Sequence, residues 1–104
     1  MTGTTRSSAG LDARRRRILY RSWHRGTREM DLLMGRFADA CIGELSEDDV
    51  AAFERLIEVD DPDLYVWLGG GAPAPDFDTP LFQRFRQFHL SGEGVPEMLK
   101  TPRT

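Results

Sequence analysis

The feature that most constrains the fold is a helical repeat of apolar residues between positions 28 and 42. These residues recur at three- and four-residue steps, a spacing that brings side chains onto one stripe of an α-helix. The stripe consists of Met30, Leu33, Met34, Phe37, Ala38 and Cys41. We therefore predict a helix from Arg28 to about Ile42 that packs this stripe into a hydrophobic core, with Cys41 buried as a small apolar residue.

Four other segments carry the start signals of helices. Each begins with a side chain that can accept a hydrogen bond from a free amide of the first turn, and two of them add a proline, Pro62 and Pro80, at the first helical position. The predicted N-cap residues are Asp12, Ser46, Asp61 and Thr79. The predicted helices cover residues 12–25, 46–59, 61–68 and 79–90. Residues 72–77, which include two prolines, are expected to form an extended connector.

No segment of the sequence shows the alternation of apolar and polar residues that is typical of a half-buried strand. We therefore predict an all-α fold, a compact five-helix bundle. A chain of 104 residues suffices for one hydrophobic core but not for two. The predicted single domain spans residues 11–92, between a disordered lead-in at residues 1–10 and a frayed, flexible tail at residues 93–104.

The charge balance limits the classes of partner. With 14 basic and 17 acidic side chains, the formal net charge is −3, which disfavours general nucleic-acid binding. The four consecutive arginines of Arg14–Arg17 would point in directions about 100° apart around a helix, so they cannot form one compact basic patch. We interpret the run as a solvated helix face. A small helical nucleic-acid-binding or regulatory protein that uses these arginines is the alternative.

Cysteine usage and hydropathy bear on the compartment. The single cysteine cannot form an internal disulfide, which is consistent with a reducing environment. No apolar stretch approaches the length that a membrane-spanning helix needs. We therefore expect a cytoplasmic protein that does not associate with a membrane.

The sequence offers no constellation of side chains that would make the chain an enzyme. His24 and His89 are the two histidines, and neither has a second ligand at metal-binding spacing. The glycines at 69–71 lack the lysine and the serine or threonine of a nucleotide-binding loop. We expect no catalytic residues, no metal ion and no stably bound cofactor in this chain.

One short segment carries more charge than helix formation needs. The residues Arg25-Gly26-Thr27-Arg28-Glu29 lie between the first two predicted helices. Gly26 is expected in the left-handed conformation as the C′ residue of the first helix, and Thr27 as the N-cap of the second. Helix capping together with solvated charge would explain these residues. Alternatively, the charged side chains project from one exposed end of the bundle and discriminate a protein partner.

This segment resembles the RGxxE motif of the small succinate dehydrogenase assembly factors, which are the flavinylation factors of bacteria and mitochondria. A second recurring block of that family resembles Asp60–Leu64 followed by Trp67 and Leu68. The resemblance implies a five-helix bundle that binds the flavoprotein subunit of succinate dehydrogenase, and in bacteria often that of fumarate reductase. It implies an assembly chaperone that promotes covalent attachment of FAD to a histidine of that subunit, without binding FAD stably itself.

The resemblance also implies a partner-binding site. The residues that carry the motif, and that should lie against the flavoprotein near its flavin, are Arg25, Gly26 and Glu29. The rim contacts are expected to be Arg28, Asp31 and Tyr20. The block from Asp61 to Trp67 suits the core as well as it suits an interface, and the sequence leaves these two roles open.

Overall fold

The computed structural model describes residues 10–90, and all the regular structure in this range is helical, as predicted. The elements are α1 (Ala13–Ser22), α2 (Arg28–Cys41), α3 (Glu47–Leu56), α4 (Asp61–Leu68), the short 3₁₀ helix η1 (Pro75–Phe77) and α5 (Pro80–Leu90). The predicted tail, and the predicted lead-in apart from Gly10, lie outside the described residues.

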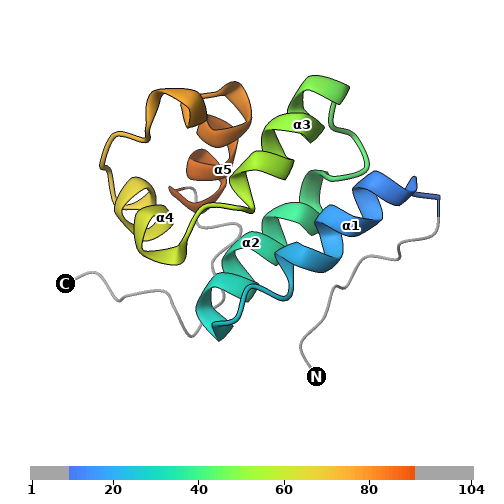
Figure 1. Ribbon diagram of the computed structural model, residues 1–104, viewed down its shortest axis with the longest axis horizontal. Helices are drawn as coiled ribbons and strands as arrows, with labels where there is room; N and C mark the ends of the chain where they lie inside the picture. The colour runs from blue at the N-terminus through green and yellow to red at the C-terminus, as the bar shows by residue number, and fades with distance from the viewer. Residues whose placement is uncertain (1–9, 91–104) are drawn as a thin grey trace.

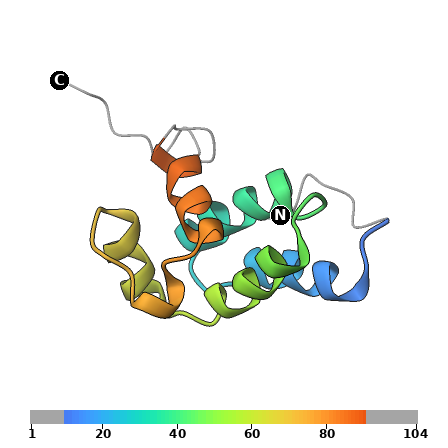
Figure 2. The ribbon, with the colours of Figure 1, turned by 90° about the horizontal axis from the view of Figure 1, so that it is seen from above.

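The five helices form a bundle in which most of the packed helix pairs are not consecutive in the sequence. Helices α1 and α2 run antiparallel, side by side, and the turn between them forms one end of the bundle (Figure 1). Helix α3 packs against both α1 and α5, and α5 also packs against α2. Helix α4 lies on the side of the bundle away from α1 (Figure 2). This is the compact five-helix bundle that the sequence predicts.

The core is centred on the predicted stripe of α2. Five of its six residues, Met30, Met34, Phe37, Ala38 and Cys41, are buried, while Leu33 is only partly buried against the core. The ring of Phe37 lies within 5.5 Å of Phe53 on α3 and within 5.0 Å of Phe85 on α5, measured between ring centroids. Aromatic pairs at these separations add to the stability that burial alone provides. The α2 stripe therefore joins three helices in one core.

Most of the predicted helix starts are confirmed by hydrogen bonds. The side chains of Asp12, Thr27 and Ser46 each accept a hydrogen bond from a backbone amide three residues later. Thr79 does the same for Phe82, with a distance of 3.1 Å between hydroxyl oxygen and amide nitrogen. The assignment of Asp61 as an N-cap was wrong. Helix α4 begins at Asp61 itself, which places Pro62 second in the helix, and its N-cap residue Asp60 makes no side-chain capping bond.

Three further details differ from the sequence prediction. Helix α3 ends at Leu56, with Ile57 as its C-cap, and not near Val59. Helix α1 ends at Ser22 rather than near Arg25, because Trp23 turns inward, is buried, and donates from its indole nitrogen to Asp39 at 3.1 Å. The connector expected to be extended contains the 3₁₀ turn η1. This turn forms because the amide of Phe77 donates to the carbonyl of Ala74 at 2.8 Å, and the Phe77 ring then packs beside Trp67 of α4.

Candidate functional site

The corner between α1 and α2 depends on a glycine. Gly26 has a φ of +116°, a conformation that side chains bearing a Cβ rarely adopt, so the expectation of a special backbone at this position is confirmed. It is not the C′ residue of α1, since that helix already ends at Ser22 with Trp23 as its C-cap. A Cβ atom placed on Gly26 would have no neighbour within 4 Å. The backbone of Gly26 is therefore open to an approaching molecule.

Arg25 does not project from the corner as expected, because its side chain turns inward and is only 8% exposed. The guanidinium donates hydrogen bonds to the backbone carbonyls of Ile57 and Val59, the latter at 2.6 Å. It also forms an ion pair with the carboxylate of Asp61 at 2.8 Å. Arg25 thus joins the α1–α2 corner to the turn between α3 and α4, and a direct contact with a partner is not available to its buried guanidinium in this conformation.

Two carboxylates hold the backbone of the corner in place. Asp31, on the first turn of α2, accepts hydrogen bonds from the amides of Arg25 and Gly26, the second at 3.3 Å. Asp61 uses its other oxygen to accept from the hydroxyl of Thr27 at 3.1 Å. Asp31 is only partly exposed. Its carboxylate is engaged by the backbone amides of the corner, so its observed role is to hold the corner and not to make the expected rim contact.

The remaining predicted site residues are exposed. Arg28 and Glu29 lie on the first turn of α2, and within the described part of the chain neither side chain forms a hydrogen bond or an ion pair. Glu29 sits at the helix N-terminus, where the helix dipole favours a negative charge. Tyr20, near the end of α1, is 63% exposed. These three side chains and the open backbone of Gly26 are available to a partner.

His24 belongs to the same surface, although the sequence analysis assigned it no role. Its ring stacks on the ring of Tyr20 with centroids 3.9 Å apart and an angle of 18° between the planes. Its Nδ1 lies 2.6 Å from the backbone carbonyl of Tyr20. The four-residue separation of these two residues, which places side chains on one face of a helix or of its last turn, is the signal that could have identified this pair.

A cleft of about 490 Å³ lies beside the corner. One wall comes from the end of α1 and the residues that follow it, and the other wall comes from residues 57–62. At the rim, Arg21 and Glu58 form an ion pair at 2.6 Å, and the nearby guanidinium lowers the pKa of the Glu58 carboxyl. The two segments that carry the family resemblance therefore border a single cleft.

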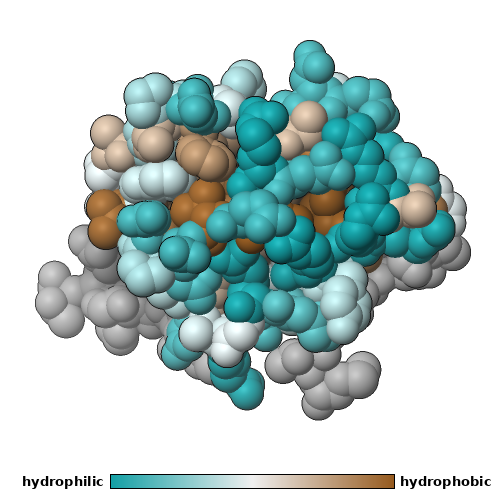
Figure 3. Space-filling view, viewed as in Figure 1, coloured by the Kyte–Doolittle hydropathy of each residue, from teal (hydrophilic) through white to brown (hydrophobic). Residues whose placement is uncertain are grey.

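A second cleft of similar volume, about 470 Å³, lies between the first turns of α3 and the start of α5, away from the segments that carry the family resemblance. Hydrophilic residues cover most of the face shown in Figure 3, and hydrophobic residues appear mainly in a narrow band across its middle. The exposed large apolar side chains of the described residues are Tyr20, Tyr65, Val66 and Leu90. Among residues 10–90 we find no group of three side chains suited to a metal ion and no helix long and apolar enough to span a membrane.

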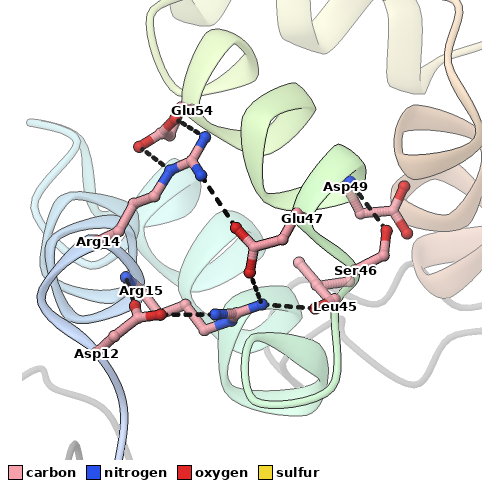
Figure 4. Close-up of polar contacts among 8 residues, drawn as sticks. All are labelled: Asp12, Arg14, Arg15, Leu45, Ser46, Glu47, Asp49 and Glu54. Carbon is pink, nitrogen blue, oxygen red and sulfur yellow. Dashed lines mark hydrogen bonds and ion pairs between the residues drawn. The ribbon is translucent and has the colours of Figure 1, made fainter.

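Three of the four arginines at residues 14–17 make contacts within the chain: Arg14 and Arg15, shown in Figure 4, and Arg16, which donates to the carbonyl of Leu11. Arg14 forms ion pairs with Glu54 at 2.8 Å and with Glu47 at 3.2 Å. Arg15 pairs with Asp12 at 2.7 Å and donates to the carbonyl of Leu45 at the same distance. Since acidic side chains neutralise these guanidinium groups, the arrangement supports a structural role for the run rather than a basic patch for nucleic acid.

Two titratable groups away from the corner, the buried Cys41 and the partly buried His89, also fit structural roles. Burial raises the pKa of the Cys41 thiol to about 12, so the reactive thiolate is scarce at neutral pH. Burial lowers the pKa of His89 to about 4, and its Nε2 lies 3.0 Å from the carbonyl of Leu33. Neither group lies at the α1–α2 corner.

The fold and this surface define a class of protein: a small helical bundle that presents a polar, preformed corner suited to protein binding. The sequence model of the family described as flavinator of succinate dehydrogenase matches residues 16–89. The chain belongs to this family.

Individual relatives agree with this assignment. The chain is 40% identical over 75 residues to the FAD assembly factor SdhE of Acetobacter pasteurianus, covering 71% of this chain and 69% of the relative. It is 43% identical over 61 residues to the FAD assembly factor SdhE of Idiomarina loihiensis, covering 59% of this chain and 68% of that protein. It is 34% identical over 93 residues to the mitochondrial succinate dehydrogenase assembly factor 2 of Drosophila grimshawi, covering 86% of this chain but only 63% of the fly protein.

Proposed function

We propose that this protein is an assembly chaperone that binds the flavoprotein subunit of succinate dehydrogenase and promotes the covalent attachment of FAD to it. Membership of the flavinator family carries the proposal. Two bacterial relatives are named FAD assembly factors, and a fly relative is named a succinate dehydrogenase assembly factor. The exposed corner at Gly26 and Glu29 supplies a surface through which such binding would occur.

The proposed mechanism is orientation rather than donated chemistry. By binding one conformation of the flavoprotein, the chaperone raises the population of the state in which the flavin and its acceptor histidine are correctly placed. The covalent bond then forms within the flavoprotein. In this proposal the chain is not an enzyme, contributes no reacting group, and does not retain FAD.

Different parts of the corner would contribute in different ways. Gly26 lacks a side chain, so the partner backbone could approach it closely. Glu29 and Arg28 would make charge-assisted hydrogen bonds that select the correct partner. Tyr20 and Asp31 would lie at the rim of the contact. Arg25, whose side chain is buried, would support the corner from behind.

The proposal extends to clients and compartment. The flavoprotein subunit of fumarate reductase is proposed as a second client, since the chain resembles factors that often serve it in bacteria. The proposed compartment is the cytoplasm, where the flavoprotein subunit would be met before assembly. Co-purification of both flavoproteins with this chain from its host would test the client range, and recovery of neither would contradict it.

The decisive experiment measures covalent flavin directly. The flavoprotein subunit is co-expressed with the wild-type chain or with the Glu29→Ala variant, and flavin fluorescence is read on the denatured polypeptide. We expect Glu29→Ala to lower covalent flavin about tenfold, the loss expected when a charge-assisted contact is removed. Asp48→Ala is the matched control, because Asp48 is an exposed acid in the first turn of α3. Equal flavinylation by all three chains would refute the docking corner.

A second test compares two substitutions of Gly26 that impose the same backbone strain. Both Gly26→Ala and Gly26→Arg place a Cβ at a φ of +116°, so both variants carry a similar backbone penalty of about 1–2 kcal/mol. Only the arginine adds bulk on the open side of the corner. We expect much lower flavinylation with Gly26→Arg than with Gly26→Ala. Similar flavinylation by the two variants would show that close approach to Gly26 is unnecessary.

A further inference from the structure

The two sequence blocks that carry the family resemblance are physically joined, and one buried side chain makes most of the connection. Arg25 leaves the α1–α2 corner and reaches the turn between α3 and α4, more than thirty positions later in the chain. Its guanidinium has three acceptors there, the carbonyls of Ile57 and Val59 and the carboxylate of Asp61. Such a fork of donors fixes the relative position of both segments more strongly than a single contact would.

Asp61 is the central residue of this connection because both of its oxygens contact the corner. One oxygen lies 2.8 Å from the Arg25 guanidinium, and the other accepts from the Thr27 hydroxyl at 3.1 Å. The same hydroxyl oxygen of Thr27 caps α2 by accepting from the amide of Met30 at 3.3 Å. Asp61 therefore acts on the start of α2, the turn on which Glu29 is presented.

We propose that Asp61 and Arg25 are positioning residues that lock the α1–α2 corner to the start of α4, so that a partner meets both segments as one preformed surface. This inference rests on the proposed function, because it assigns the lock a role in binding the flavoprotein. Neither residue needs to touch the partner. Because these contacts already hold the corner rigid in the free protein, the corner loses less conformational entropy when it binds.

The burial of the connection supports this role. The side chain of Arg25 is 8% exposed and that of Asp61 is 19% exposed, so the ion pair is screened from solvent much more than the surface pairs of α1. Asp63, two residues further along α4, is exposed and forms no hydrogen bond or ion pair within the described residues. The two aspartates thus share a helical turn and a charge, but only Asp61 contacts the corner.

Asp61 and Asp63 provide a matched experiment. The affinity of the purified flavoprotein subunit is measured for the wild-type chain, Asp61→Ala and Asp63→Ala, each first checked by thermal unfolding to be folded at the assay temperature. We expect Asp61→Ala to weaken binding about tenfold, because an acceptor of a charged hydrogen bond is lost. Asp63→Ala should change the affinity less than about twofold. Asp61→Asn, which keeps one acceptor oxygen, should restore part of the loss.

Two readouts separate positioning from general stability. Amide hydrogen exchange at Gly26 should accelerate in Asp61→Ala, while exchange in the middle of α2 stays at its wild-type rate. In a double-mutant cycle, the binding loss caused by Glu29→Ala should shrink in the Asp61→Ala background, since Glu29 is then already misplaced. Binding losses that simply multiply, or unchanged exchange at Gly26, would overturn the inference.

The experiment also distinguishes the docking role of the corner from the positioning role of Asp61. If Glu29→Ala weakens binding and Asp61→Ala does not, the docking corner stands and the positioning role of Asp61 is refuted. If Glu29→Ala binds with wild-type affinity, the corner itself is not the docking surface, and the positioning role falls with it.

Discussion

Trp23 and Gly35 are in direct contact, with the indole ring of one packed on the bare backbone of the other. A Cβ atom built on Gly35 would come within 2.3 Å of Cδ2 in the Trp23 ring, a separation that atoms cannot occupy. Trp23 is the C-cap of α1, and Gly35 lies within α2. The contact therefore packs the end of α1 closely against α2, just before the chain turns at Arg25 and Gly26.

We predict that Gly35→Ala destabilises the fold. Alanine is the better helix former by about 1 kcal/mol, so an uncrowded glycine in this helix would gain stability from the change. Here the added methyl group must displace the buried indole, and overpacking of this kind costs about 1–3 kcal/mol. Urea unfolding monitored by circular dichroism would measure the difference. As a control, Gly35→Ala should be less harmful in a Trp23→Leu background, and an increase in stability on the wild-type background would contradict the packing argument.

A second prediction concerns the pH dependence of stability through His89. Its Nε2 lies near the carbonyl of Leu33, while its Nδ1 is buried without a hydrogen-bond partner in the described structure. Burial lowers the folded-state pKa of His89 to about 4, against an ordinary value of 6.5. Between these two values the unfolded chain binds a proton that the folded chain does not. Neutral His89 therefore makes its full contribution to the free energy of unfolding above pH 6.5. This contribution, about 3 kcal/mol in total, is lost as the pH falls towards 4.

His89→Gln isolates this effect from the carboxylates that titrate over the same range. The glutamine amide can still donate to the carbonyl of Leu33, but it does not titrate. We expect the difference in unfolding free energy between wild type and His89→Gln to vary with pH from 6.5 down to 4 and to be constant above 7. A difference independent of pH would show that His89 is protonated equally in the folded and unfolded states.

Local features of the fold could be predicted from the sequence because they depend on neighbouring residues. The apolar stripe of α2 and the caps at Asp12, Thr27 and Ser46 depend on residues three or four positions apart, and they are confirmed except that Leu33 of the stripe is only partly buried. The requirement for glycine at position 26 was also predictable from its place between two helices. These features follow from the geometry of a single helix and its ends.

The direction of the Arg25 side chain could not be predicted in the same way. It is decided by carbonyls at Ile57 and Val59, which come near only after α3 and α4 have packed. The same tertiary contact overrode the capping signal of Asp61, because its carboxylate faces Arg25 and Thr27 and not the free amides of α4. The sequence identified the corner, while the division between exposed and supporting residues required the fold.

A third prediction concerns the reactivity of Cys41. Its thiol is buried, donates to the carbonyl of Phe37 at 3.2 Å, and has a pKa raised to about 12 by burial. At pH 8 the thiolate fraction is about a thousandfold lower than that of an ordinary cysteine. We expect a chromogenic disulfide reagent to react with the native chain only as fast as the chain opens, and rapidly in urea. Ala40→Cys in a Cys41→Ala background, which presents an exposed thiol on the next residue, should react at once. Rapid modification of native Cys41 would contradict its burial.

The fourth prediction concerns Arg86, which holds the end of α4 against α5. Its guanidinium donates to the carbonyl of Trp67 at 2.9 Å and to that of Gly71 at 2.7 Å, and it lies 5.1 Å above the centre of the Phe82 ring. Trp67 lies in the last turn of α4, where carbonyls lack the usual partner four residues later, and its oxygen otherwise accepts a long bond of 3.3 Å from the amide of Gly70. Arg86→Met keeps the apolar stem but removes the donors, so we expect a loss of about 1.5–3 kcal/mol in unfolding free energy.

Arg84→Met is the matched control for this change, since Arg84 lies on the same helix and its side chain forms, among residues 10–90, just one polar contact, an exposed ion pair with Glu44 at 3.0 Å. Removing that pair should cost less than about 1 kcal/mol and should do so only at low salt. Denaturant unfolding of the two variants at low and high salt would compare them directly. Equal losses would mean that water satisfies the carbonyls of Trp67 and Gly71 as well as Arg86 does, and that the other contacts of α4, such as the burial of Leu64 and the ion pair of Asp61 with Arg25, suffice to hold this helix in place.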